Sequence, residues 1–358
     1  MERVKVMSNW EEYVRTVEPY VPGEQPNQPD MIKLNTNENP YPPASGVVEA
    51  LKNFDTDKLR LYPEPTCKVL VDAIADYYGI RSSQVFTGVG SDDVLAMIFM
   101  TFFNSKKPIL FPDITYSFYD VWANMLRIPF ETKALDDDFQ IRKEDYYGDN
   151  GGVVFPNPNA PTGILMPLSE IEDIIAHNRD VIVVVDEAYI DFGGESALPL
   201  IEKYDNLLVV QTFSKSHSLA GMRLGFAMGN EKLIRYINDV KYSFNSYTLN
   251  QTALVLGVQA IRDREYFEET CAKVIATREW TKCELKKLGF SFGDSMSNFI
   301  FATHERVPAK EIFEALREHN IFVRYFSKPR ISNYLRISIG TQQEMERLIA
   351  FLAVFLGE

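Results

Sequence analysis

Cysteine and histidine are scarce in this sequence of 358 residues, which has three cysteines and four histidines. Cys67, Cys271 and Cys283 are scattered and form no CxxC pair. Such a sparse, odd number fits reduced thiols in the cytoplasm better than a disulfide framework. The histidines show neither HxH nor HExxH spacing, so we expect no histidine-rich metal site.

Long apolar runs and an excess of basic residues are also missing. No stretch of about 20 apolar residues occurs, so we expect no membrane span and no membrane partner. The first residues, MERVKVMSNWEEYV, contain no apolar h-region, so we expect no signal peptide. The formal net charge of −13 disfavours a nucleic-acid partner, because phosphate binding needs a basic face.

Helix-like stretches alternate with short apolar runs between about residues 66 and 240. Helices are expected at 66–78, 91–103 and 168–178, and strands at Ile109–Phe111, Val153–Phe155, Val181–Val185 and Leu207–Gln211. The run Val181–Val185 has no polar alternation, which is typical of a strand buried on both faces of a parallel sheet. The pattern predicts an α/β fold with a mostly parallel sheet covered by helices.

The pattern changes near residue 250, where one or two long helices are expected over 251–288. Further helices are expected at 308–319 and 342–356, and strands at Asn298–Phe301, Phe322–Tyr325 and Leu335–Ile339. We therefore predict a large domain over 45–248 and a smaller α+β domain over 249–358. Residues 1–44 would form an N-terminal arm and part of the small domain. Two domains are the natural expectation for this length.

Polar side chains follow the predicted strands where each strand ends. Asp186 and Tyr189 come after Val181–Val185, and Lys215 comes after Leu207–Gln211. The carboxyl ends of such strands are where open α/β sheets bind ligands. A lone lysine after a strand is usually a surface residue. Beside these groups, a lysine shielded from water can instead be a Schiff-base nucleophile.

Two glycine-containing segments suggest an anion site. Gly88–Asp93 (GVGSDD) precedes a helix-like run, and the N-terminus of a helix presents free backbone N–H groups to an anion. Ser91 or Asp92 could alternatively be a simple helix cap. Arg223 lies between glycines in GMRLG and suits two-pronged contacts to oxyanions. The patterns GxxxxGK[ST] and GxGxxG are absent, so a nucleotide held in either mode is not expected.

Together these motifs resemble the fold-type I pyridoxal-phosphate aminotransferases. Within that family the set is most similar to the subgroup that acts on histidinol phosphate. The resemblance extends from about residue 20 to 341 and implies pyridoxal 5′-phosphate as the cofactor. The matching segments, in family order, are Leu34–Pro40, Arg60–Pro63, Gly88–Asp93, Asn157–Gly163, Asp186–Tyr189, Phe213–Lys215, Leu219–Gly225 and Tyr334–Ser338.

The resemblance implies a catalytic role for three residues. Lys215 would hold the cofactor as a Schiff base and then move a proton as general base. Asp186 would keep the pyridine nitrogen protonated, and Tyr189 would hydrogen-bond the phenolate oxygen. Tyr116 would stack on the ring. Family members usually carry Asn directly before Pro-Thr-Gly, but this chain has Ala160 there, so Asn159 or Asn157 could replace that contact, or Tyr189 could act alone.

The resemblance also implies how the phosphate group of the cofactor would be bound. Tyr62 would reach the cofactor phosphate from a neighbouring subunit, which requires a homodimer with a shared active site. The residues expected on the cofactor phosphate within one chain are Ser91, Asp92, Thr212, Ser214 and Arg223.

The substrate would be held by residues of the arm and the small domain. Arg336 would bind the α-carboxylate of the amino donor, and Arg324, with Arg330 as a second candidate, would bind a substrate phosphate. Tyr20 and Asn37 would lie nearby. The implied reaction exchanges an amino group between L-histidinol phosphate and 2-oxoglutarate, in histidine biosynthesis. Alternatives are an aromatic-amino-acid aminotransferase, a threonine-phosphate decarboxylase-like enzyme, and a cofactor-binding regulatory module without catalysis.

Overall fold

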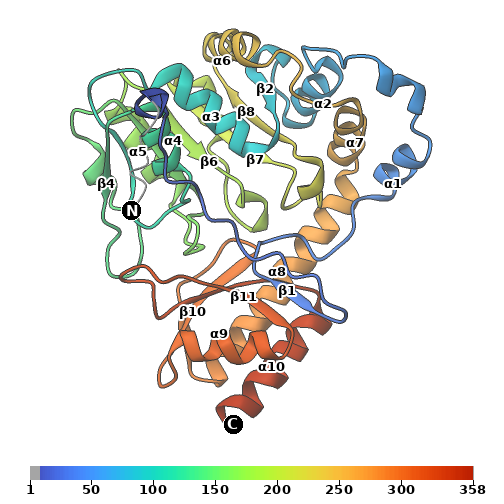
Figure 1. Cartoon of the computed structure of the whole chain (residues 1–358), viewed down its shortest axis with the longest axis vertical. Coiled ribbons are helices and arrows are strands. Elements are labelled where there is room, and N and C mark those ends of the chain that lie inside the picture. The colour runs from blue at the N-terminus through green and yellow to red at the C-terminus, as the bar shows by residue number, and fades with distance from the viewer. Residues whose placement is uncertain (1–8, 358) are drawn as a thin grey trace, which may run out of the picture.

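The computed structural model describes residues 9–357, which form a larger and a smaller unit around two sheets (Figure 1). Residues 1–8, in the segment where we expect no signal peptide, lie outside the described residues. None of the helices within 9–357 combines the length and apolarity that a membrane crossing requires.

The sheet of the larger unit has seven strands among the described residues, in the order β2-β8-β7-β6-β5-β3-β4. β8 is antiparallel to both of its neighbours, and all other pairs are parallel, so the predicted mostly parallel sheet is confirmed. Its strands are β2 (Val85–Gly88), β3 (Ile109–Pro112), β4 (Phe130–Lys133), β5 (Gly152–Pro156), β6 (Val183–Asp186), β7 (Leu207–Thr212) and β8 (Gly225–Gly229).

Helices cover both faces of this sheet, which explains why β6 shows no polar alternation. Val183 and Val185 point into one apolar layer and Val184 points into the other, and all three are fully buried. The first layer is closed by α1 (Ser45–Lys52), α2 (Lys68–Tyr78), α5 (Leu168–His177) and α7 (Gln251–Arg262). The second is closed by α3 (Gly90–Phe102), α4 (Tyr119–Leu126) and α6 (Glu231–Phe244).

The smaller unit contains a five-stranded sheet, counted over residues 9–357, in the order β1-β11-β12-β10-β9. β1 is parallel to β11, so the N-terminal segment joins strands from the end of the chain. The domain boundaries stay a prediction, and α7 packs into the core of the larger sheet. The elements are β1 (Ile32–Leu34), α8 (Arg264–Lys287), β9 (Phe290–Phe292), β10 (Phe299–His304), α9 (Ala309–Glu318), β11 (Ile321–Tyr325), β12 (Leu335–Ser338) and α10 (Gln342–Leu356).

Short 3-10 helices lie in the connections. They are η1 (Asn9–Tyr13), η2 (Thr56–Arg60), η3 (Ser82–Gln84), η4 (Lys143–Tyr146), η5 (Ile190–Phe192), η6 (Leu198–Glu202) and η7 (Ala220–Met222).

Candidate active site

A cavity of ≈ 180 Å³ opens at the carboxyl ends of β5, β6 and β7. Its wall brings together nine of the residues that we predicted from the sequence, while their roles stay predictions. These residues are Ser91, Asp92, Tyr116, Asp186, Tyr189, Thr212, Ser214, Lys215 and Arg223.

Lys215 supplies an amine to this cavity from the turn that follows β7. Its Nζ atom donates to the carbonyl oxygen of Thr36 at 3.1 Å and lies 5.7 Å from the centre of the Tyr189 ring. The side chain is partly buried, and Glu38 also lines the cavity. Among the described residues the amine therefore has one hydrogen-bond acceptor, a backbone carbonyl, and a carbonyl compound in the cavity could reach it.

Asp186 supplies a buried carboxylate at the end of β6, where only 4% of the residue is exposed. Its Oδ2 accepts from the Tyr119 hydroxyl at 2.9 Å, and its Oδ1 accepts from the Ala188 amide at 3.3 Å. Burial raises the pKa of Asp186 to about 6, although both hydrogen bonds favour the charged form. A buried acid of this kind is well suited to pair with a cationic ring N–H.

Glu187 is the next residue along the chain and faces a separate buried network. Its carboxylate accepts from the Ser196 hydroxyl at 2.6 Å, the Ala197 amide at 2.6 Å and the Gln211 amide at 2.9 Å. Burial nevertheless raises the pKa of Glu187 from an ordinary 4.5 to about 7. Between these pH values the folded chain retains a proton that the unfolded chain has lost. The associated stability is complete below about pH 4.5 and is lost as the pH rises through 7.

Glu187→Gln should remove this pH dependence, because glutamine does not titrate. Raising the pH from 5 to 8 should therefore shift the stability difference by up to about 3 kcal/mol in favour of the variant. Urea unfolding of the cofactor-free wild type and variant at both pH values would measure the shift. A stability difference that is equal at pH 5 and pH 8 would contradict the raised pKa.

The hydroxyl of Tyr189 is held by Asn37. The Asn37 side-chain amide donates to this hydroxyl at 3.0 Å, and Asn37 itself adopts a left-handed backbone with φ 57°. The Ser338 hydroxyl donates to Asn37 Oδ1 at 2.8 Å, and Asn298 donates to its carbonyl at 3.0 Å. We predicted Asn37 near the substrate, and the structure places its amide on Tyr189. Since that hydroxyl already accepts a bond, its proton is free for a group in the cavity.

A cradle of donors at one end of the cavity fits a phosphate group. A Cβ on Gly90, whose φ is 80°, would lie 2.4 Å from Arg223 Nη2, and a Cβ on Gly225 would lie 2.3 Å from the Ser91 nitrogen. The two glycines thus let a guanidinium and the N-terminus of α3 approach one point. Arg223 also donates to Asp92 Oδ2 at 2.8 Å. With the nearby amine and buried acid, the cavity fits pyridoxal 5′-phosphate.

Two predicted cofactor contacts are not brought to the cavity within one chain. The Asn159 amide donates to the Ile114 carbonyl and to the Thr162 hydroxyl, both at 3.0 Å, so it holds its own loop. Ala160 lines the cavity instead. Tyr62 is 81% exposed and stacks on Tyr247 with ring centres 4.7 Å apart.

Two predicted substrate residues, Arg324 and Arg336, face each other on neighbouring strands outside the cavity wall. Arg336 donates to the Asn35 carbonyl at 3.0 Å, while its buried Nε atom has no hydrogen-bond partner among the described residues. Burial lowers the pKa of Arg336. Two adjacent cations with an unsatisfied buried donor indicate an anion site. Tyr20 stacks on Phe118 with ring centres 4.3 Å apart.

Sequence reasoning missed three residues of the site. Thr36 and Glu38 line the cavity, although only Asn37 between them was given a role. Their signal was the motif LNTNENP itself, in which they alternate with Asn37. Tyr119 lies beneath Asp186 at the start of α4, and its only sequence signal was its helical spacing from Tyr116.

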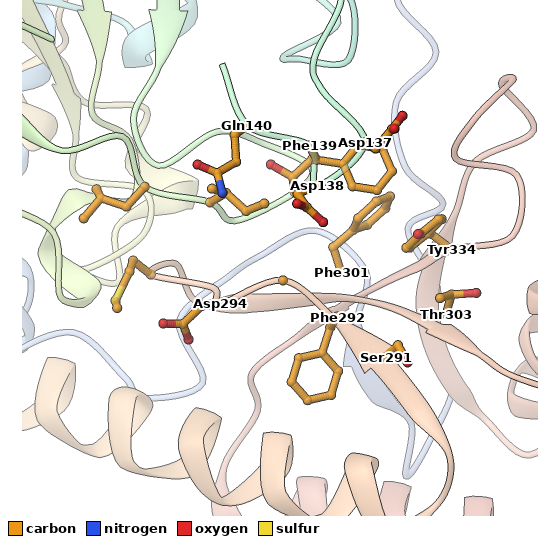
Figure 2. Close-up of a pocket in the computed structure, with 15 residues that line it drawn as sticks. Asp137, Asp138, Phe139, Gln140, Ser291, Phe292, Asp294, Phe301, Thr303 and Tyr334 are labelled. Carbon is orange, nitrogen blue, oxygen red and sulfur yellow. The ribbon is translucent and has the colours of Figure 1, made fainter. Parts of the chain in front are cut away.

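A larger cavity of ≈ 580 Å³ lies elsewhere, between residues 137–140 and the smaller sheet (Figure 2). Asp138, Asp294, Phe301 and Tyr334 are among its lining residues, and none of the predicted site residues is. Because the amine, the buried acid and the phosphate cradle meet in the smaller cavity, that one is the candidate active site.

The sequence matches the family model for aminotransferase class I and II over residues 29–352. A histidinol-phosphate aminotransferase from Clostridium botulinum (strain Langeland) is 53% identical over 340 residues, covering 95% of this chain and 96% of the relative. Another from Lactococcus lactis subsp. cremoris is 51% identical and covers 97% of this chain and 98% of the relative.

Solved structures share the fold. The histidinol-phosphate aminotransferase from Clostridium acetobutylicum superposes with a TM-score of 0.84, at 20% identity, covering 91% of this chain and 99% of that one. The enzyme of the same name from Sinorhizobium meliloti, in complex with pyridoxal-5′-phosphate, gives a TM-score of 0.83 at 22% identity and covers 91% of both chains.

Proposed function

This chain belongs to the class I and II aminotransferase family, and we propose that it exchanges an amino group between L-histidinol phosphate and 2-oxoglutarate in histidine biosynthesis. It is a transaminase that uses pyridoxal 5′-phosphate. The observation that carries the substrate choice is the pair Arg324 and Arg336, in which the buried Nε–H group of Arg336 has no partner within residues 9–357. Arg324 suits the phosphate of histidinol phosphate, and Arg336 suits the carboxylate of glutamate or 2-oxoglutarate. Relatives of 51% and 53% identity that carry this name support the proposal.

The residues of the cavity divide the chemistry between them. When bound, pyridoxal 5′-phosphate supplies an electron-accepting ring that stabilises negative charge on the substrate Cα. We propose that the amine of Lys215 moves a proton between this Cα and the C4′ carbon of the cofactor. Asp186, whose Oδ2 accepts from the Tyr119 hydroxyl at 2.9 Å, would hold a proton on the ring nitrogen. Tyr189 would donate its proton to the phenolate oxygen, and Tyr116 would cover the ring.

The cradle at the start of α3 would hold the cofactor phosphate. Ser91, Ser214 and Arg223 line the cavity, and the Arg223 guanidinium and the Ser91 amide lie against Gly90 and Gly225. The Thr212 hydroxyl donates to Ser214 Oγ at 3.0 Å and fixes that side chain. Asp92 anchors the guanidinium of Arg223 through an ion pair.

A second copy of the chain would complete the site. Tyr62 would then reach the cofactor phosphate of that copy, which makes the enzyme a homodimer. Exposed apolar side chains in the segment that carries Tyr62 support this proposal, because Leu59 is 61% and Leu61 51% exposed. The three unpaired cysteines fit the cytoplasm as the compartment.

Steady-state kinetics with histidinol phosphate, phenylalanine and tyrosine as amino donors would test the substrate assignment. A site built around a phosphate should prefer the phosphorylated donor by about 10²-fold or more in kcat/KM. Equal turnover of phenylalanine and histidinol phosphate would overturn the proposal and favour an aromatic-amino-acid aminotransferase. Release of carbon dioxide from a phosphorylated amino acid would instead favour the decarboxylase.

Arg324→Ala should separate the two anion contacts. We expect kcat/KM for histidinol phosphate to fall by about 10²-fold, while kcat/KM for glutamate, whose carboxylate is assigned to Arg336, changes little. The surface variant Arg179→Ala, which removes an exposed pair with Asp205, is the matched control. Equal losses for both substrates would contradict the division of roles between the two arginines.

A further inference from the structure

The segment 326–334, here called the β11–β12 connection, joins the two strands that carry the anion-binding pair. Arg324 is the register partner of Arg336, and Tyr325 is the partner of Leu335. The connection therefore leaves the sheet directly beside both arginines. Wherever the connection is anchored, the ends of both strands are anchored with it.

Arg330 anchors this connection to the larger unit. Its Nη2 donates to the carbonyls of Leu135 at 2.8 Å and Asp136 at 2.7 Å, and its Nη1 donates to Asp113 Oδ2 at 3.2 Å. Asp113 in turn accepts from the Leu135 amide at 2.9 Å, so the acceptors form one fixed group. The hydrogen bonds of this guanidinium are therefore made to the larger unit and not to residues of the candidate active site.

The backbone at this contact is held in an unfavourable conformation on both sides. Arg330 has φ 66° and Phe139, on the facing loop, has φ 60°. The left-handed region is costly for a bulky residue and persists only where neighbours enforce it. The Phe139 ring packs edge-on against Tyr334 at 5.2 Å and against Phe301 at 5.8 Å, where these three rings lie together in Figure 2. The Arg330 guanidinium carbon lies 5.7 Å from the Phe139 ring centre.

The segment to which Arg330 is bound through Asp113 also forms part of the wall of the cofactor cavity. Asp113 directly follows β3, and the same short segment continues to Tyr116, which lines the cavity. Thr115 in this segment donates to Asn159 Oδ1 at 3.3 Å, which links it to the loop that carries Ala160. Arg330 therefore ties the strands of the anion pair to the segment that forms one wall of the cofactor site.

We propose that Arg330 is a positioning residue, whose contacts with Asp113, Leu135 and Asp136 set the placement of Arg324 and Arg336 relative to the cofactor cavity. This Arg330 latch rests on the proposed function, in which those two arginines bind the substrate anions. The forked guanidinium suits the task because it reaches two carbonyls and a carboxylate at once.

Kinetics of holoenzyme variants test the latch. Arg330→Ala should raise KM for both histidinol phosphate and glutamate by roughly tenfold, because misplacing both arginines weakens every substrate anion contact. The value of kcat should stay within about twofold, as for a loss of uniform binding. The KM values of Arg330→Lys should lie between those of the wild type and Arg330→Ala, since an ammonium group lacks the forked donors of a guanidinium. Arg179→Ala is the control and should leave both constants unchanged.

A second readout separates positioning from folding. Hydrogen–deuterium exchange of residues 326–334 and 135–140 should become faster in Arg330→Ala, while the absorbance of bound cofactor stays at the wild-type level. Asp113→Asn keeps an acceptor for the Leu135 amide but removes the charge, so its rise in KM should be smaller. In the double variant the two effects should not add, since they break the same contact.

Wild-type KM values in Arg330→Ala, or unchanged exchange in both segments, would overturn the latch. Additive effects in the double variant would do the same. If Arg330→Ala does not fold, Arg330→Lys and Asp113→Asn decide the question. A wild type that does not use histidinol phosphate would refute the proposed function alone, because the KM for glutamate and the exchange rates still test the latch.

Discussion

Replacing Lys215 by alanine is expected to abolish transamination. The variant lacks both the amine that forms a covalent bond with the cofactor aldehyde and the base that moves the proton. Each contribution is large, so kcat should fall by at least about 10⁴-fold. The cradle formed by Ser91, Ser214 and Arg223 is intact in this variant, so the cofactor should still bind but without its lysine-dependent visible absorbance.

Borohydride reduction followed by peptide mapping gives a readout that does not depend on turnover. In the wild type the cofactor should become fixed to the peptide that contains Lys215, and in the variant no peptide should carry it. Lys203→Ala, which removes an exposed lysine paired with Glu172, is the matched control. Retained activity in Lys215→Ala, or cofactor fixed to another lysine, would reject the assignment.

Asp186→Asn should produce the second largest loss. Asparagine can still accept the Tyr119 hydrogen bond, but it carries no charge to balance a protonated ring nitrogen. Breaking a buried ion pair typically costs 3–5 kcal/mol, so kcat should fall by about 10² to 10⁴-fold. A cofactor analogue with an N-methylated ring keeps its positive charge without help from the protein. Exchanging the natural cofactor for this analogue should therefore raise the activity of the variant, whereas it should not raise the activity of the wild type.

The neighbouring variant Glu187→Gln provides a stringent comparison. It also neutralises a buried acid, but one bonded to Ser196, Ala197 and Gln211 instead of facing the cavity. We expect it to retain most of the activity. A loss equal to that of Asp186→Asn would show that buried charge in general, and not contact with the cofactor, explains the effect.

Much of the fold and part of the site were predictable from local patterns. The apolar run Val181–Val185 marked a strand buried on both faces, and the structure has β6 over Val183–Asp186. The strand begins later because the Val181 amide bonds to the Asn178 carbonyl in a turn. Since parallel strands share one carboxyl edge, Asp186 and Lys215 were bound to meet there once their strands were identified.

Contacts that depend on distant segments were not predictable in this way. Nothing local in Gly225–Gly229 indicates that β8 runs antiparallel within a mostly parallel sheet. Asn159 had a suitable side chain, but its amide is used by Ile114 and Thr162, which only the folded loop brings near. Arg330 looked like a phosphate ligand by charge alone. Its partners Leu135 and Asp136 are backbone carbonyls, which leave no mark in a sequence.

The parallel pairing of β1 with β11 has a consequence for how this chain folds while it is being synthesised. Ile32 pairs with Ile321 and Leu34 pairs with Val323, and just beyond β1 the chain places Thr36 and Glu38 against the cavity. Until β11 has been synthesised, β1 has no strand with which to pair. The wall formed by Thr36 and Glu38 can therefore be fixed only after β11 has been synthesised, and deleting β11 would open that side of the cofactor cavity.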